Sequence, residues 1–445
     1  MRACEHARAP ATKRPTDRRA ATASVPSDAA VKLSGVPVPA NARSVPYVRA
    51  RRESTAPAGA AGGGGPSWEE AKQCPRAASW AALRGLWAFS SIERQRKCRL
   101  VPTSELVSVE KRAERANYSG LQTCGSRFTC PMCGPKIAAE RAVEIAAALS
   151  AHTVNGGRVL LVTLTMRHSR AQRLDGLLDG LGGAWTAIRK DRAFRRLYGA
   201  HGLGWIKRLD VTHGANGWHP HLHVLVFVDG AMTDVDAHEL GAAMFTPWAR
   251  TLVKLGLAAP TQASGIDVKL LALGEAHESV SSYVAATEYA AAGPMGAALE
   301  LANGSTKRAR AGNRTAMQLL ADVVRFGLAG DHALWREYEQ ATRRRAQILW
   351  SNGLRSALIG DLDELTDEEA AQSNDGAARL LLLLNHRTWR SVRSTPGRPA
   401  ELLSWAERHD DDDQARELVA QLLTLHGHGS AIFPTAADVE SVRHH

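Results

Sequence analysis

The sequence predicts an α+β fold, with a central antiparallel sheet flanked by helices and a helical C-terminal region. From about residue 136, segments of helical period alternate with short apolar runs rich in Val, Ile and Thr. Two of these runs flank the turn sequence "HGANG" and indicate a hairpin. Three cysteines within ten residues, Cys124 to Cys133, predict an added metal-binding element rather than disulfides.

The chain is predicted to begin with a disordered basic arm. Residues 1–66 hold eleven Lys and Arg against four Asp and Glu, end in "GGGGP" and show no helical or strand period. The alternative is that translation starts downstream of this segment. Residues 67–135 are expected to form a helix, from about 68 to 97, followed by the cysteine element.

The next region, 136–330, is expected to form the α+β domain, and 331–445 a helical C-terminal region. The periodicity and the turn residues predict seven elements in this order: helix 135–153, strand 157–168, helix 174–198, hairpin 205–228, helix 234–257, strand 265–272 and helix 277–292.

The charge balance favours a polyanionic partner. The formal net charge is +11 and the isoelectric point about 9.6, and basic residues placed on phosphates release condensed counterions. No stretch approaches the ~18 apolar residues that span a bilayer, and the basic N-terminal residues lack the apolar block expected of a secretory signal. We therefore expect a cytoplasmic protein with no membrane partner.

Three histidines alternate in the stretch "GWHPHLHVLVFV" from Gly217 to Val228. Residues two apart on a strand point to one face, so His221 and His223 should project together. Pro220 cannot donate to a ladder and prefers a strand start or edge, so the paired strand is expected to begin near His221. His219 is then the weaker candidate ligand, at the mouth of the strand.

Two imidazoles about 7 Å apart along a strand can share one divalent ion. Asp210 lies in the first strand of the predicted hairpin, and a carboxylate is the natural third ligand for Mg or Mn. The competing interpretations are satisfied surface histidines and a solvent-facing aspartate.

The cysteine element begins with "CGSRFTCPMC". The C-x-x-C pair Cys130 and Cys133 is half of a tetrahedral zinc site, and Cys124 offers a third ligand. Reduced, unliganded thiols are the alternative.

The histidine strand resembles a known signature. "PHLHVLVF" is similar to the His-hydrophobic-His motif of rolling-circle replication initiators, the HUH endonucleases. "LVTLTMRH" upstream resembles their first motif, and "SSYVAATEY" downstream their third, the helix that carries the nucleophilic tyrosine. "CGSRFTCPMCGPKIAAERA", "GNRTAMQLLAD" and "ALWREYEQATRRRAQILWSNGLR" resemble more narrowly the Rep proteins of actinobacterial plasmids. The resemblance covers about residues 95 to 357.

The resemblance implies a function. Such a protein initiates plasmid replication by nicking single-stranded or extruded hairpin DNA at the origin, and later rejoins the strand. A tyrosine attacks the phosphodiester, which leaves a 5′-phosphotyrosine link and a free 3′-OH primer, with a divalent metal polarising the phosphate. Host helicase and polymerase would be partners, and residues 136–330 would be the nickase and strand-transfer domain.

The resemblance assigns the nucleophile to Tyr283. Tyr289 is six residues further on, 600° around a helix, so the two do not face one metal together. The chain departs from the family at two positions. Ala286 stands where a Lys often follows the tyrosine, and Ser279, next to Glu278, stands where some relatives carry a water-activating Glu.

The resemblance also suggests the remaining site residues. Cys98, which follows "RQRK", fits the family's upstream cysteine and would complete a structural Cys₄ zinc site. The basic stretch "TKRARAGNR" holds candidate DNA-binding residues: Lys307, Arg308, Arg310 and Arg314. A second basic stretch starts at Arg189. Trp185, Trp205 and Trp218 could stack unpaired bases or pack in the core.

Two other interpretations stay open. One is an HUH transposase or relaxase, which uses the same chemistry on other DNA. The other is a zinc-ribbon DNA-binding regulator without catalysis, for which Ala286 is the best support.

Overall fold

A computed structural model describes residues 75–112, 115–271, 312–360, 364–373, 378–408, 412–429 and 431–434. The described residues belong to one compact unit, Gly64–His445. Among the helices of the described residues, none combines the length and the apolar character needed to cross a bilayer. The predicted helix 277–292 lies outside the described residues.

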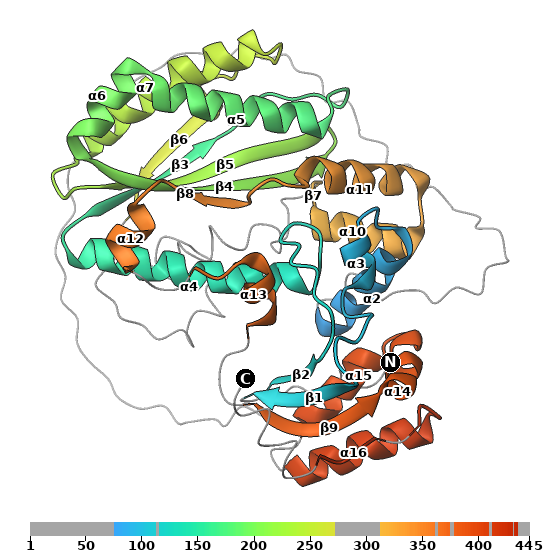
Figure 1. Ribbon diagram of the computed structural model, residues 1–445. Helices are drawn as coiled ribbons and strands as arrows, with labels where there is room; N and C mark the ends of the chain where they lie inside the picture. The colour runs from blue at the N-terminus through green and yellow to red at the C-terminus, as the bar shows by residue number, and fades with distance from the viewer. Residues whose placement is uncertain are drawn as a thin grey trace, which may run out of the picture. The chain divides into compact units, whose positions relative to one another are not determined.

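The predicted α+β fold is confirmed (Figure 1). The helices are α2 (Pro75–Phe89), α3 (Glu93–Lys97), α4 (Cys133–Val154), α5 (Leu174–Lys190), α6 (Arg192–His201), α7 (Asp234–Lys254), α8 (Gln262–Gly265), α10 (Ala316–Phe326), α11 (Ala329–Thr342), α12 (Leu354–Ile359), α13 (Asp367–Gln372), α14 (His386–Ser394), α15 (Arg398–Glu407) and α16 (Asp412–Leu425). The strands are β1 (Leu106–Arg112), β2 (Arg115–Ser119), β3 (Arg158–Leu164), β4 (Gly202–Gly214), β5 (Gly217–Val228), β6 (Ile266–Leu270), β7 (Arg314–Thr315), β8 (Ile348–Trp350) and β9 (Arg379–Asn385).

A six-stranded sheet forms the centre. Its order is β6-β3-β5-β4-β7, with β8 also pairing with β4, and every pairing is antiparallel. The predicted hairpin is confirmed: β4 and β5 close through the pair Gly214 and Gly217, around a two-residue turn. Gly217 has φ +86°, and a Cβ there would lie 2.9 Å from the Cα of Arg170, so both the turn and the close approach favour glycine.

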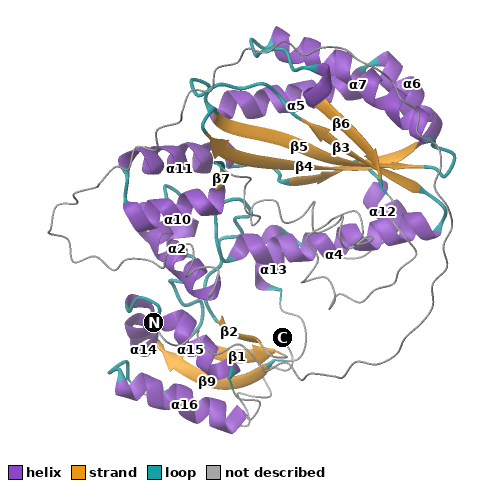
Figure 2. Ribbon diagram, turned by 180° about the vertical axis from the view of Figure 1, so that it is seen from behind, coloured by secondary structure: helices purple, strands orange, loops and turns teal. Residues whose placement is uncertain are grey.

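The two faces of this sheet are covered differently. Helices α5, α6 and α7 lie on one side and α4 and α12 on the other, as Figure 2 shows from behind. Leu222, Val224 and Val226 pack into the core on the α5 side. Leu225 and Phe227 pack with Ile145 and Leu149 of α4. Because side chains alternate along β5, the odd-numbered residues of this strand share the α4 face.

A smaller three-stranded antiparallel sheet has the order β2-β1-β9. Its core joins Val107 and Val109 of β1 to Leu382 of β9 and to Trp389 of α14, and it includes the four buried cysteines of the cysteine element. Residues from both ends of the described chain thus share one core.

The structure differs from the expected elements in several places. The region 67–135, expected to hold a helix and the cysteine element, also contributes β1 and β2. The single helix 174–198 is broken at Asp191, whose extended backbone and carboxylate cap the start of α6 by accepting from two backbone N–H groups. The helix 68–97 is divided, with α2 ending at Phe89 and α3 beginning at Glu93. The region 331–445 is helical as predicted but also contributes β8 and β9. The division of the chain into four regions stays a prediction.

Candidate active site

Three side chains of the central hairpin converge on the α4 face of the sheet. Asp210 of β4 is directly opposite His221 of β5, and His223 is two residues further along. One donor atom from each of the three lies within 4.8 Å of the others. The sequence pattern predicted this set, and the structure places its members together as a group that could hold a metal ion.

The donor distances fit one coordination shell. Asp210 Oδ2 lies 3.9 Å from His221 Nε2 and 3.7 Å from His223 Nε2. Ligands about 2.1 Å from an octahedral ion lie roughly 3.0 to 4.2 Å from one another. All three side chains are partly exposed, so the group has an open side. Three ligands with open positions are what a substrate-binding metal requires.

Arg208 orients the carboxylate. Its guanidinium is fully buried, and Nε lies 2.7 Å from Asp210 Oδ1, so that Oδ2 is the oxygen left facing the histidines. Burial lowers the pKa of Arg208, and the Asp210 charge opposes that shift. Sequence reasoning missed this residue, although its position two before Asp210 on the same strand face was a usable signal.

His221 is set up as a neutral ligand, and the ring of His223 is held by a neighbouring hydroxyl. Burial lowers the pKa of His221 to about 4, against the opposing effect of Asp210, so its imidazole is uncharged at neutral pH. His223 Nδ1 lies 3.3 Å from Thr163 Oγ1 of β3. An Nδ1–H that donates to this hydroxyl leaves the Nε2 lone pair toward Asp210, the usual arrangement around a metal-binding histidine.

The expectation that the paired strand begins near His221 is wrong. β5 begins at Gly217, and both His219 and Pro220 are paired with β4. Pro220 is tolerated because β3 ends opposite Leu222, so beyond that point β5 has a neighbour on one side only.

His219 is partnered outside the three-ligand group. Its Nδ1 lies 2.8 Å from Nε2 of His168, and His168 Nδ1 donates to the carbonyl of Asn216. Burial lowers the pKa of His219 to about 4.

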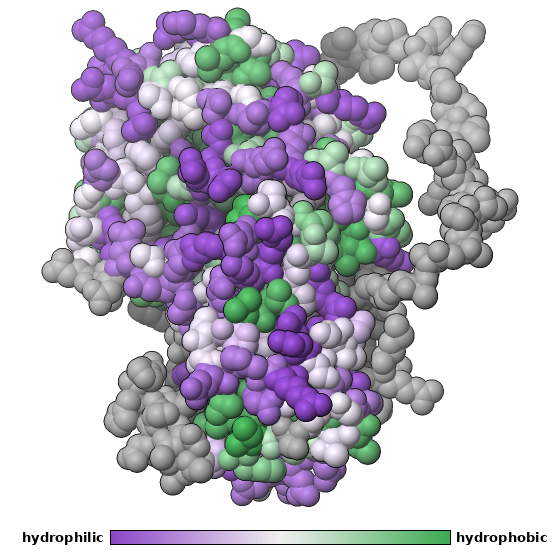
Figure 3. All heavy atoms as spheres, turned by 45° about the vertical axis from the view of Figure 1, so that its right-hand side comes forward, coloured by the Kyte–Doolittle hydropathy of each residue, from purple (hydrophilic) through white to green (hydrophobic). Residues whose placement is uncertain are grey.

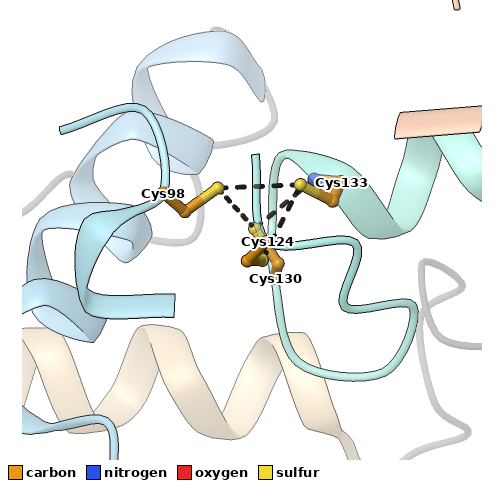
Figure 4. Close-up of side chains that lie close together, drawn as sticks. All are labelled: Cys98, Cys124, Cys130 and Cys133. Carbon is orange, nitrogen blue, oxygen red and sulfur yellow. Dashed lines mark hydrogen bonds between the residues drawn. The ribbon is translucent and has the colours of Figure 1, made fainter. Parts of the chain in front are cut away.

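The four predicted cysteines form a second group. The sulfur atoms of Cys98, Cys124, Cys130 and Cys133 are turned toward one another (Figure 4), all are buried, and all lie within 4.8 Å of each other. Cys98 Sγ is 3.6 Å from the sulfurs of Cys130 and Cys133, and Cys124 Sγ is 3.8 Å from that of Cys133. Four thiolates about 2.3 Å from a tetrahedral ion would lie roughly 3.8 Å apart.

The local structure shapes this group. Cys133 is the first residue of α4, and its backbone N–H donates to Cys130 Sγ at 3.4 Å. Hydrogen bonds from the neighbouring thiols lower the pKa of Cys133, whereas burial raises the pKa of Cys130. The cluster thus favours one thiolate and disfavours several, unless a cation neutralises them.

The other predicted site residues are mostly outside the described part. Tyr283, Tyr289, Lys307, Arg308 and Arg310 lie there, as do the departures at 278, 279 and 286. Arg314 is described, in β7, and Nη1 lies 2.9 Å from carboxylate oxygens of both Asp322 and Asp331. A DNA phosphate would have to compete with these two carboxylates.

The stacking role considered for the tryptophans is wrong for two of them. Trp185 and Trp218 are 2% and 3% exposed and belong to the core. Trp205 is partly buried and lies under the guanidinium of Arg189, 5.4 Å from its ring centre.

Comparison with known proteins identifies the relatives of this chain. Residues 116–233 match the family described as "Replication protein". A "Protein rep" of Streptomyces lividans is 28% identical over 389 residues, covering 73% of this chain and 84% of that protein. A "Neomycin resistance protein" of Streptomyces cyanogenus is 29% identical over 172 residues, 33% of this chain and 39% of that protein. No solved structure matches.

The resemblance to plasmid replication (Rep) proteins is therefore confirmed. The family match contains the three-ligand group and three of the four cysteines, and it ends before Tyr283.

Proposed function

We propose that this protein is a plasmid rolling-circle replication initiator, a metal-dependent, site-specific DNA nickase and strand transferase. One observation carries the proposal: a carboxylate and two imidazoles converge, partly exposed, on one strand pair inside the segment that matches the replication-protein family. Such a group suits a divalent cation bound together with a phosphate substrate.

Tyr283 is the proposed nucleophile. Its phenolic oxygen loses its proton and bonds to phosphorus, and the bond from phosphorus to the 3′ oxygen breaks. The released 3′ oxygen takes up a proton and becomes the primer end, while the 5′ phosphate stays on the tyrosine. Attack by a 3′-OH on this link reverses the step and rejoins the strand.

Asp210, His221 and His223 would hold Mg or Mn. When bound, the ion supplies polarisation of the scissile phosphate oxygens. Arg208 keeps Oδ2 of Asp210 toward the two histidines, and Thr163 fixes the ring of His223. These contacts support a preformed site on rigid strands, which is what phosphoryl transfer requires.

Cys98, Cys124, Cys130 and Cys133 would hold a structural zinc ion. Four buried ligands leave no open position, which fits a stabilising rather than a catalytic metal. The proposed DNA partner is single-stranded or extruded hairpin DNA at a plasmid origin, with Lys307, Arg308, Arg310 and Arg314 as candidate contacts. A host polymerase would extend the primer while a host helicase unwinds the duplex ahead of it.

The test is covalent capture. Purified protein is incubated with Mn and supercoiled cognate plasmid, and nicked circles and the protein–DNA adduct are separated on denaturing gels. The wild type is expected to give both, Tyr283→Phe neither, and the matched control Tyr289→Phe both. Nicking by Tyr283→Phe at the wild-type rate would overturn the nucleophile. DNA binding by the wild type with no nicking would favour the DNA-binding regulator instead.

A further inference from the structure

Helix α14 presents a row of arginines that the proposed chemistry does not use. Arg387 and Arg390 are exposed and Arg393 is partly exposed, at intervals of three residues along one helix. They lie roughly 60° apart around the axis and span roughly 9 Å along it. They therefore line one side of the helix.

The opposite side of α14 is anchored in the protein. Trp389 and Val392 are 1% and 0% exposed and belong to the core of the three-stranded sheet. The Trp389 ring lies 4.9 Å from that of Tyr118, and its Nε1 donates to the carbonyl of Leu100. Asn385 caps the helix start by accepting from Thr388 N–H. The arginine row is thus carried on a fixed support.

This positive charge is not neutralised locally. Other arginines around the small sheet face carboxylates, as in Arg76 with Glu407, Arg398 with Glu401 and Arg416 with Asp413. Within the described part of the chain, no ion pair joins a carboxylate to an arginine of α14. The sequence from residue 376 to 400 contains no acidic residue.

A fourth guanidinium adds to the same end of the helix. Arg84 of α2 donates to the carbonyls of Arg393 and Ser394, at 3.3 and 2.9 Å. Burial and the nearby charge of Arg390 together lower the pKa of Arg393, which places two like charges close together. Figure 3 turns toward the viewer the side on which α14 lies in Figure 1, and the surface there carries hydrophilic side chains interspersed with apolar ones.

We propose that the exposed face of α14 is a second DNA-binding surface, which holds the phosphate backbone of duplex DNA through Arg387, Arg390 and Arg393. Duplex rather than single-stranded DNA is favoured because Trp389 is buried and cannot stack on unpaired bases, and the ring of His386 is held by a hydrogen bond to the carbonyl of Ser104. An anionic membrane is disfavoured because the apolar side of the helix already packs in the protein core. The proposal rests on the proposed function only in taking origin DNA as the natural ligand.

The test measures duplex binding by the full chain without any nicking step. Fluorescence anisotropy with a labelled duplex of about 30 base pairs is followed as a function of salt. Each phosphate contact contributes about 0.9 to the slope of log affinity against log salt. The triple variant Arg387→Ala/Arg390→Ala/Arg393→Ala is expected to bind about 10- to 100-fold more weakly, with a slope lower by about 2 to 3. The variant Arg387→Lys/Arg390→Lys/Arg393→Lys keeps the three positive charges, so we expect it to bind duplex DNA with most of the wild-type affinity.

The matched control removes three exposed arginines elsewhere, as Arg325→Ala/Arg336→Ala/Arg343→Ala in α10 and at the end of α11. This variant is expected to bind duplex within about threefold of wild type. Equal losses in both triple variants, or an unchanged slope in the α14 variant, would overturn the proposal. The proposal would also be overturned if the α14 variant lost binding to anionic phosphatidylglycerol vesicles but bound duplex DNA as tightly as the wild type.

Nicking of a single-stranded oligonucleotide separates this proposal from the proposed function. The α14 variant should nick it at the wild-type rate. If the wild type binds duplex DNA through α14 but does not nick, the proposed duplex-binding surface is supported and the proposed nicking function is contradicted.

Discussion

The two groups of candidate metal ligands differ in number, chemistry and burial. The cysteine group has four soft ligands, all buried, at the junction of α3 and α4. The group on the sheet has three harder ligands, all partly exposed, on adjacent strands. A closed set of four can only hold its ion, whereas an open set of three can share its ion with a substrate. The difference supports the proposal that the cysteine group would hold a structural ion and that the group on the sheet would hold a catalytic one.

The residues that contact the candidate ligands differ between the two groups in the same way. Cys130 receives a backbone N–H from its own turn, a local bond that forms wherever the turn forms. Asp210 is held by Arg208, a charge buried inside the sheet. A buried charge costs stability unless it is paired, so its presence beside the open group favours a functional reason.

The largest expected effect is a loss of stability when one of the four clustered cysteines is replaced. Cys133→Ser is expected to lower the free energy of unfolding by about 3 kcal/mol or more, because a structural metal contributes directly to folding. Thermal unfolding followed by circular dichroism, together with zinc content per chain, would measure both losses. His223→Ala, a ligand of the other group, is the control and should leave both quantities near wild type. A Cys133→Ser protein as stable as wild type would make the cluster a set of unliganded thiols.

A smaller effect, on the Mn requirement for nicking, is expected from replacing Arg208, which orients Asp210. Arg208→Met should raise the Mn concentration for half-maximal nicking by about 10- to 100-fold, since partners that orient a ligand contribute that much to metal affinity. The exposed Arg250→Met of α7, on the opposite face of the sheet, is the matched control. An unchanged Mn requirement with reduced stability alone would show that Arg208 is structural and does not position Asp210.

The hairpin and its ligands could be predicted from the sequence because their signals are local. Strict alternation places His221 and His223 on one face, and a short turn fixes the register that brings Asp210 opposite His221. The C-x-x-C spacing predicted half of the cysteine group in the same way. Cys98 came from the family resemblance, since no local pattern joins it to residues more than twenty positions away.

Three features could not be predicted from the sequence because they depend on tertiary contacts: strand β9, the start of β5 and the role of Arg208. The run "RLLLLLN" forms β9 because both faces of the strand are buried, which overrides the helical preference of leucine. The start of β5 was misplaced because Pro220 is tolerated where β3 has already ended. Arg208 was missed because an arginine on a strand is normally solvated, and only the folded sheet shows it buried against Asp210.

The most direct test of the division between the two groups is the double variant His221→Ala/His223→Ala, assayed for nicking, unfolding temperature and zinc content in parallel. We predict that nicking falls on the order of 10³-fold or more, while unfolding temperature and zinc content stay at wild-type values. A variant that nicks as fast as the wild type would contradict the account.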